Sequence, residues 1–254
     1  MLNSTQRFSS RVENYIKYRP GYPKAIIDLL RKECQLNSAS VIADIGSGTG
    51  ILTELLLKNG NTVFGVEPNQ EMRTAAERLL SGYPQFHSIP ATAEATTLPE
   101  KSVDLITAGQ AFHWFDCAKA RQEFLRILKP EGWVALIWND RNISAHPFFE
   151  AYEQLLQTHA TDYAAVGHKH TDAELVGSLF GKSGFKIATF PNEQVFDFQG
   201  LQGRLLSSSY TPEPGHPKHA PMLAELSAVF QQHQVNGKVT FEYDTAVYYG
   251  RLSP

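Results

Sequence analysis

An apolar segment runs into a glycine-rich turn in Val41-Ile42-Ala43-Asp44-Ile45-Gly46-Ser47-Gly48-Thr49-Gly50, and a helical pattern begins at Ile51. Glycines at the carboxyl end of a strand let the backbone turn tightly, and they let a ligand come closer than a Cβ atom would allow. This order of strand, glycine turn and helix therefore predicts a binding site for a nucleoside-type ligand.

Short apolar segments alternate with helical patterns on both sides of this turn. This alternation is typical of a parallel sheet covered by helices on both faces, so we predict an α/β fold with a doubly wound, mostly parallel sheet. The expected strands cover residues 41–45, 62–66, 86–89, 103–108 and 133–138, and the expected helices cover 51–58, 70–80 and 118–128.

The pattern becomes less regular after Asn139. No internal repeat or Gly/Ser linker divides the chain, so we predict a single domain over residues 1–254. Within it we expect N-terminal cover helices (1–35), a cofactor-binding core (36–140) and an acceptor-side elaboration with closing strands (141–254). The last part should contain helices at 147–159, 172–182 and 222–234, extended segments at 185–190 and 195–198, a turn-rich cover at 207–217 and a closing edge strand at 239–249.

Three ligand classes compete for the glycine turn. A triphosphate-binding loop needs Lys followed by Ser or Thr after its last glycine, but Ile51 and Leu52 follow Gly50. A dinucleotide loop needs Gly or Ala where Ile51 stands. Asp44 would repel a pyrophosphate, whereas it would attract the α-amino group of a methionine moiety. The turn therefore favours S-adenosylmethionine.

Glu67 ends the second expected strand, and a carboxylate at this place can accept hydrogen bonds from both ribose hydroxyls. NAD would use such a carboxylate equally well. An NAD(P)-dependent oxidoreductase and a non-catalytic S-adenosylmethionine-binding protein therefore stay open as alternatives to an enzyme that uses this cofactor.

At these residues the chain resembles the class I S-adenosylmethionine-dependent methyltransferases, whose first motif is an acid, any residue, and Gly-x-Gly-x-Gly. Asp44, Gly46, Gly48 and Gly50 match this motif, and Ala93-Glu94 is similar to the family's adenine-contacting segment. The resemblance implies a Rossmann-like, mostly parallel seven-stranded sheet with an antiparallel C-terminal edge strand and helical cover elements. It also implies methyl transfer from S-adenosylmethionine, with S-adenosylhomocysteine as the product.

Two further segments, 15–23 and 109–115, resemble the small-molecule branch that includes trans-aconitate methyltransferases. In that branch an N-terminal helix folds over the cofactor, which implies that Tyr18 and Arg19 contact it. The complete set of residues expected to bind the cofactor is Tyr18, Arg19, Asp44, Gly46, Ser47, Gly48, Gly50, Glu67, Pro68, Ala93, Glu94 and Gln110.

The expected acceptor is a small molecule, with a carboxylate as one candidate group. The Asp/Asn-Pro-Pro-aromatic motif of the branch that methylates nucleic acids and proteins is absent after the fourth expected strand. His113 follows that strand and is the candidate general base, although an acceptor carboxylate would need none. The candidate acceptor-binding residues are Trp114, Trp138 and Arg141. The planar guanidinium group of Arg141 would suit a carboxylate.

The composition limits the partners. Net charge is -3, the basic residues are scattered, and no apolar run approaches the length of a membrane helix, so we expect a cytoplasmic protein that binds neither nucleic acid nor membrane. The two cysteines, Cys34 and Cys117, offer no disulfide framework. A cluster of His and Asp at Asp162, His168, His170 and Asp172 lacks the spacing of a metal site, and no metal is expected.

Overall fold

A computed structural model describes residues 11–141, 146–161, 163 and 173–253. Its seven strands form one sheet in the order β3-β2-β1-β4-β5-β7-β6. The first five strands in this order are parallel, and β7 is antiparallel to both of its neighbours. The strands are β1 (Val41–Ile45), β2 (Thr62–Val66), β3 (Phe86–Ile89), β4 (Val103–Gly109), β5 (Leu128–Arg141), β6 (Lys186–Phe196) and β7 (Val239–Gly250).

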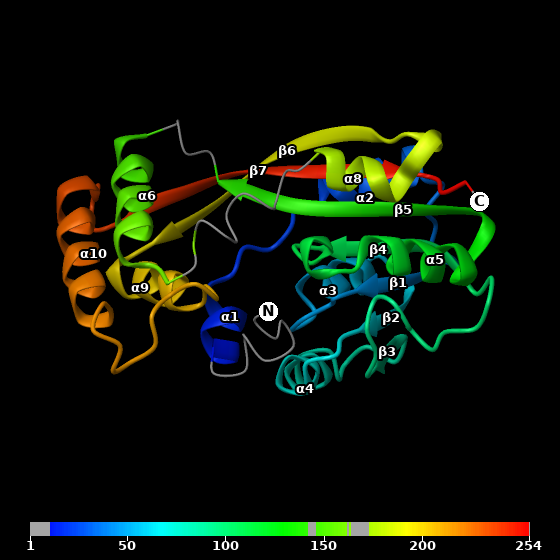
Figure 1. Ribbon diagram of the computed structural model, residues 1–254, viewed down its shortest axis with the longest axis horizontal. Coiled ribbons are helices and arrows are strands. Elements are labelled where there is room, and N and C mark those ends of the chain that lie inside the picture. Colours follow the sequence, from blue (N-terminus) through cyan, green and yellow to red (C-terminus); the bar gives the residue numbers. More distant parts are fainter. Residues whose placement is uncertain (1–10, 142–145, 162, 164–172, 254) are drawn as a thin grey trace.

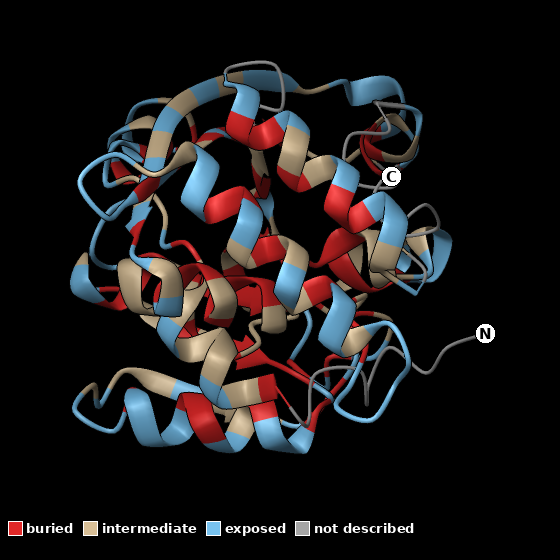
Figure 2. Cartoon of the chain, turned by 90° about the vertical axis from the view of Figure 1, so that its left-hand side faces the viewer, coloured by how far each residue is buried: buried red, intermediate tan, exposed pale blue. Residues whose placement is uncertain are grey.

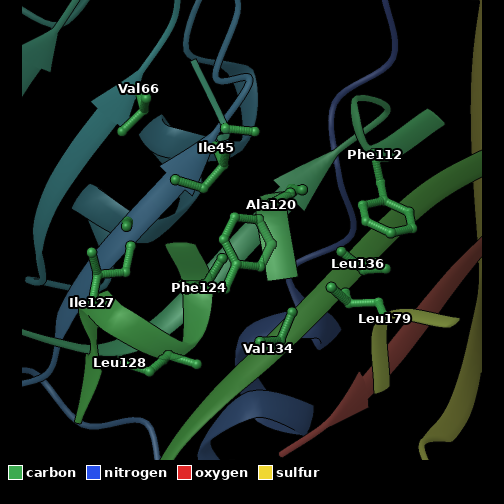
Figure 3. Packing of buried hydrophobic residues seen from close by; sticks show 14 of the residues in the cluster. Ile45, Val66, Phe112, Ala120, Phe124, Ile127, Leu128, Val134, Leu136 and Leu179 are labelled. Atoms are coloured by element: carbon green, nitrogen blue, oxygen red, sulfur yellow. The ribbon is translucent and has the colours of Figure 1, made fainter. Parts of the chain in front are cut away.

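Helices cover both faces of the parallel part of the sheet (Figure 1). Apolar side chains of α2, α3 and α4 pack on one face, and those of α5 and α8 pack on the other (Figure 3). The helices are α1 (Val12–Tyr18), α2 (Ala25–Glu33), α3 (Ile51–Lys58), α4 (Gln70–Leu79), α5 (Cys117–Ile127), α6 (Pro147–His159), α8 (Ala173–Phe180), α9 (Phe198–Leu206) and α10 (His219–His233), with 3-10 turns η2 (Phe112–Trp114) and η3 (Gly181–Ser183).

A second apolar core lies at the far ends of β6 and β7, where α6, α9 and α10 pack together (Figures 1 and 2). Phe241 is fully buried at its centre, and its ring meets the rings of Phe148, Phe149 and Tyr152 edge-on, with centroids 5.1 to 5.4 Å apart. We call this part, made of α6, α9, α10 and the strand ends around Phe241, the distal lobe. The long strands join it to the rest of the sheet.

The predicted fold class is confirmed, and three elements differ from the expected ones. β5 begins at Leu128 and not at the expected position 133, and its pairing with β4 has a register irregularity at residues 103–105. The antiparallel strand near the C-terminus is present, but it lies between β5 and β6, so β6 is the edge. Helix α9 was not predicted: it begins at Phe198, the last residue of the extended segment expected at 195–198, and covers residues for which no element was expected.

Candidate active site

The glycine turn after β1 is held in a conformation that favours glycine. Gly46 and Gly48 have φ values of +68° and +56°, in the left-handed region. A Cβ atom at Gly46 would lie 2.6 Å from the Cβ atom of Ala111, so a side chain there would collide. At Gly48 no atom lies within 4 Å of the place where a Cβ atom would be, and this open space belongs to two cavities.

These two cavities meet at the carboxyl ends of β1 and β4. The large cavity has a volume of about 290 Å³ and extends from the glycine turn towards the distal lobe. The small cavity has a volume of about 140 Å³ and extends towards β2 and α4. The residues that line both cavities are Tyr15, Gly46, Gly48, Gly109, Gln110 and Trp114. An elongated ligand can therefore pass over the glycine turn from one cavity to the other.

Glu67 is one of the two acidic residues that line the small cavity, together with Glu94. Its carboxylate accepts hydrogen bonds from the backbone N–H groups of Gly48 (2.9 Å) and Asn69 (2.8 Å), which fix its direction. Burial raises the pKa of Glu67 above its ordinary value, although these two bonds act in the opposite direction. Pro68, Ala93 and Glu94 line the same cavity.

Asp44 lies at the end of β1 and is almost fully buried, at 1% exposure. Its two carboxylate oxygens accept hydrogen bonds from the hydroxyls of Thr53 (2.6 Å) and Thr107 (2.9 Å), and it lines the large cavity. Burial raises the pKa of Asp44 to about 6. No cation is paired with it among the described residues, so a cationic group of a ligand would stabilise its charged form.

Gln110 follows β4 in the left-handed region, with φ of +55°, which is a strained conformation for a residue with a side chain. Its backbone N–H donates to the carbonyl of Ile137 (2.9 Å), and its side-chain amide donates to the carbonyl of Asn139 (3.1 Å). These bonds hold the turn after β4 against the end of β5. His113 and Trp114 lie in the next turn, η2, and both line the large cavity.

The segment after α1 is fastened to the sheet beside this site. The carbonyl of Gly21 accepts hydrogen bonds from the side-chain amides of Asn139 (3.2 Å) and Asn192 (2.9 Å). The hydroxyl of Tyr22 lies over the backbone of Gly109. Arg19 stacks on the ring of Tyr15 at 4.9 Å and donates to the carbonyl of Ser207 (2.9 Å). This segment contributes three side chains to the lining of the large cavity: Tyr15, Arg19 and Tyr22.

Three arginines lie at the end of the large cavity that is nearest the distal lobe: Arg19, Arg141 and Arg204. Arg141 donates to the hydroxyl of Tyr163 (2.6 Å) and approaches Glu153 at 3.4 Å. Arg204 is only 6% exposed, and it donates to hydroxyls of Tyr243 (3.3 Å) and Ser208 (3.2 Å).

The comparisons with known proteins agree on one family. The chain is 30% identical over 255 residues to an uncharacterized methyltransferase of Schizosaccharomyces pombe, and the match covers 97% of both chains. A profile of the family described as "Methyltransferase domain" matches residues 43–136. The chain belongs to the class I S-adenosylmethionine-dependent methyltransferases.

Solved structures support the same fold for this methyltransferase. A structure assigned as a type II methyltransferase from Anaeromyxobacter dehalogenans has a TM-score of 0.66 and 22% identity, and it covers 93% of this chain and 99% of its own. Phosphoethanolamine N-methyltransferase 2 of Haemonchus contortus, in complex with phosphomonomethylethanolamine and S-adenosylhomocysteine, has a TM-score of 0.58 and 14% identity. It covers 100% of this chain and 59% of its own.

Most of the predicted site residues of the methyltransferase line one of the two cavities. The exceptions are Gly50, Tyr18 and Trp138. A Cβ atom at Gly50 would lie 2.7 Å from Leu80, so this glycine allows α3 to pack on α4. Tyr18 packs against Gly203 of α9. Trp138 is 1% exposed and meets Phe112 and Tyr248 in the core, because residues 134, 136 and 138 of β5 all point to that face.

Arg204 and Tyr163 also line the large cavity of the methyltransferase, although neither was among the candidate site residues. The one signal for Arg204 is that it is the single charged residue among the leucines Leu201, Leu205 and Leu206, a pattern that is unusual for a fully exposed arginine. Tyr163 carries no comparable signal.

Two negative observations apply to the described residues only. They contain no group of three or more His, Cys, Asp or Glu side chains that could hold a metal ion. The His and Asp cluster at 162 and 168–172 lies outside them. None of the helices in the described ranges has the length and apolar character needed to cross a membrane.

Proposed function

We propose that this methyltransferase binds S-adenosylmethionine across the two cavities and methylates a small organic acid that binds among the three arginines. The observation that carries the proposal is the meeting of the cavities over Gly48. One cavity presents a carboxylate, Glu67, and the other presents guanidinium groups. A ligand with ribose hydroxyls therefore fits one end, and an anion fits the other.

The residues of the small cavity and the glycine turn fit the cofactor. Glu67 would accept hydrogen bonds from the ribose hydroxyls, and Pro68, Ala93 and Glu94 would surround the adenine. Asp44 would balance the charge of the α-amino group, which supplies the cation that its buried carboxylate lacks. When bound, the cofactor supplies a methyl group that is activated by a positively charged sulfur.

The protein's own part in the reaction is alignment and the exclusion of water. Arg141 and Arg204 would hold the anionic end of the acceptor, while Trp114 and the strained Gln110 turn would shape the space between acceptor and cofactor. An acceptor carboxylate would attack without first losing a proton. An acceptor hydroxyl would need a base, for which His113 is the proposed residue.

Calorimetric titration with S-adenosylmethionine, S-adenosylhomocysteine and NADH tests the cofactor. Both adenosyl ligands should bind saturably, and Glu67→Ala should weaken them by about 10- to 100-fold, because hydrogen bonds to a charged group are lost. Glu54→Ala is the matched control, since Glu54 forms an ion pair with Lys58 on the surface of α3. Binding of NADH alone would overturn the proposal.

Formation of S-adenosylhomocysteine with a panel of small carboxylic acids then tests the acceptor. We expect turnover with acids and none with the corresponding amides, which keep the shape but lose the charge. Equal turnover of acids and amides would show that the arginines do not select the acceptor.

A further inference from the structure

The chain that follows β3 forms one wall of the small cavity. Thr92, Ala93 and Glu94 line the cavity there. Residues 92–98 belong to no helix or strand, and an isolated bridge between Thr92 and Ala95 is the regular backbone pairing that they contain. Because no ladder of backbone hydrogen bonds fixes the 92–98 segment, its position depends on its contacts with the rest of the chain.

The backbone of this segment is strained at Thr97. Its φ value is +63°, in the left-handed region, which is costly for a β-branched residue. The side chain of Thr97 is exposed, whereas its two neighbours, Thr96 and Leu98, are buried at 0% and 4% exposure. An exposed side chain gains little from packing, so the strained conformation is imposed by what holds the two buried neighbours.

One ion pair on α5 holds both neighbours of the strained residue. The carboxylate of Glu123 accepts hydrogen bonds from the backbone N–H (2.8 Å) and the hydroxyl (2.5 Å) of Thr96. Arg126 donates to Glu123 through Nε (2.7 Å) and Nη2 (2.6 Å), and to the carbonyl of Leu98 (2.8 Å). Glu123 is 8% exposed, and the bonds from Arg126 lower its pKa to about 2, so its carboxylate stays ionised.

Helix α5 is a firm support for this ion pair. Three of its side chains, Ala120, Phe124 and Ile127, are fully buried against the sheet (Figure 3). The helix is also attached to the cavity wall at its start, where the backbone N–H of Asp116 donates to the carboxylate of Glu94 (2.9 Å). The 92–98 segment is therefore tied to one rigid helix at two places, which are Glu94 and the turn around the strained residue.

We propose that Glu123 and Arg126 are positioning residues for the cofactor: by imposing the strained turn at Thr97 they keep Ala93 and Glu94 at the small cavity, and so set its affinity for adenine. Neither residue of the pair is among those that line the two cavities. The carboxylate of Glu94 would accept a hydrogen bond from the amino group of adenine and would repel the carbonyl of hypoxanthine. The inference rests on the function proposed above, which places adenine in this cavity.

Calorimetric titration tests the pair. Glu123→Ala should weaken S-adenosylhomocysteine by at least about tenfold, because affinity falls with the fraction of molecules that keep the turn. Glu123→Gln keeps an acceptor for Thr96 but loses the charge that holds Arg126, so it should weaken binding by less, and it tests the pair if Glu123→Ala does not fold. S-inosylhomocysteine, which carries hypoxanthine, should lose less affinity than S-adenosylhomocysteine in both variants. An equal loss for the two ligands would contradict positioning of Glu94.

A second substitution should rescue the first. Adding Thr97→Gly to Glu123→Gln should restore affinity for S-adenosylhomocysteine to within about twofold of wild type, because glycine adopts a positive φ readily. Gln35→Gly is the matched control, since Gln35 is also exposed, has a φ value of +59° and lies outside both cavities. It should leave the affinity of Glu123→Gln unchanged. Equal rescue by both glycines, or unchanged affinity in both Glu123 variants, overturns the proposal.

Hydrogen exchange of the unliganded protein separates this inference from the proposed function. Protection of the backbone amides of residues 95–98 should fall in Glu123→Gln and return when Thr97→Gly is added. A protein that shows this pattern but does not bind S-adenosylhomocysteine contradicts the proposed function and leaves the hold of the ion pair on the segment standing. A protein that binds S-adenosylhomocysteine, and whose Glu123 variants keep both the protection and the affinity, contradicts the positioning pair alone.

Discussion

The two cavities differ in the sign of their buried charge and in how that charge is held. At the glycine turn, Asp44 and Glu67 are carboxylates that accept hydrogen bonds from hydroxyls and backbone N–H groups. Towards the distal lobe, Arg204 is a cation that donates to hydroxyls. Neutral partners fix the direction of each side chain without cancelling its charge, so the ligand can provide the opposite charge.

The two regions also differ in how the chain builds them. The residues of the small cavity, apart from Tyr15, all lie between positions 46 and 115. The arginine end of the large cavity takes its side chains from the segment after α1, from β5, from α9 and from the segment after α9. We therefore expect the first region to be more independent of the rest of the chain than the second.

The largest expected effect is a loss of unfolding free energy when a ring is removed from either apolar core. Phe241→Ala in the distal lobe and Phe124→Ala in the core under α5 both remove a fully buried ring, and each should cost about 3–5 kcal/mol of unfolding free energy. We expect Phe241→Ala to preserve binding of S-adenosylhomocysteine and to impair binding of a small organic acid such as succinate. Denaturant unfolding and calorimetry check this. Loss of both ligands in the folded Phe241→Ala protein would mean that the regions are not independent.

The next effect concerns the space at the glycine turn. Gly48→Val should place a side chain where the cavities meet and weaken S-adenosylhomocysteine by at least about 100-fold, through overlap worth about 3 kcal/mol. Gly237→Val is the control, because Gly237 also has a positive φ and open space but lies outside both cavities. Calorimetry on both variants distinguishes loss of space from backbone strain. Equal binding by Gly48→Val and wild type would show that the cofactor binds at another site.

A smaller effect is expected where α1 holds the segment after α9. Arg11 is 7% exposed and donates to the carbonyls of Ser208 and Thr211 and to Glu213. Arg11→Ala should remove the hydrogen bonds that this guanidinium donates and cost about 2 kcal/mol. Hydrogen exchange should become faster at the backbone amides of residues 207–211. Arg11→Lys should restore part of the protection, and unchanged exchange in Arg11→Ala would contradict this role.

The smallest effect is the response of cofactor binding at the glycine turn to pH. The pKa of Asp44 is raised to about 6, so its carboxylate becomes protonated as the pH falls through that value. A bound ammonium group needs the ionised form, and affinity for S-adenosylhomocysteine should therefore fall about fivefold from pH 6 to pH 5 and stay nearly level above pH 7. Calorimetry with Asp44→Asn, which should show weak binding with a smaller slope, checks the assignment.

The sequence predicts the parallel half of the molecule well, because local patterns determine it. Helix α3 has the predicted bounds, and Glu67 lies at the end of β2 as expected. Helix α9 is missed because Gly200 and Gly203 disfavour a helix locally. The structure explains Gly203: a Cβ atom there would lie 2.0 Å from the ring of Tyr18, so the packing of α1 requires this glycine.

The arginine end was only partly predictable, for a physical reason. Arg141 follows a recognisable strand, so its place at a sheet edge could be inferred. Arg204 approaches the same cavity from a helix 63 positions later in the chain, and no local pattern relates the two residues. Which polar residues meet there depends on how the distal lobe packs on β6 and β7.

The hydrogen bonds of Arg11 set a condition for exchanging parts between relatives. They join the start of α1 to residues that lie nearly two hundred positions later, and Arg19 makes a second such connection to Ser207. A chimera that takes only its C-terminal third from a relative would combine the relative's segment 207–211, whose carbonyls accept these hydrogen bonds, with the α1 of this chain. To transfer the acceptor preference of a relative, residues 11–22 would therefore have to be exchanged together with the segment that contains Arg204 and Tyr210, which line the large cavity.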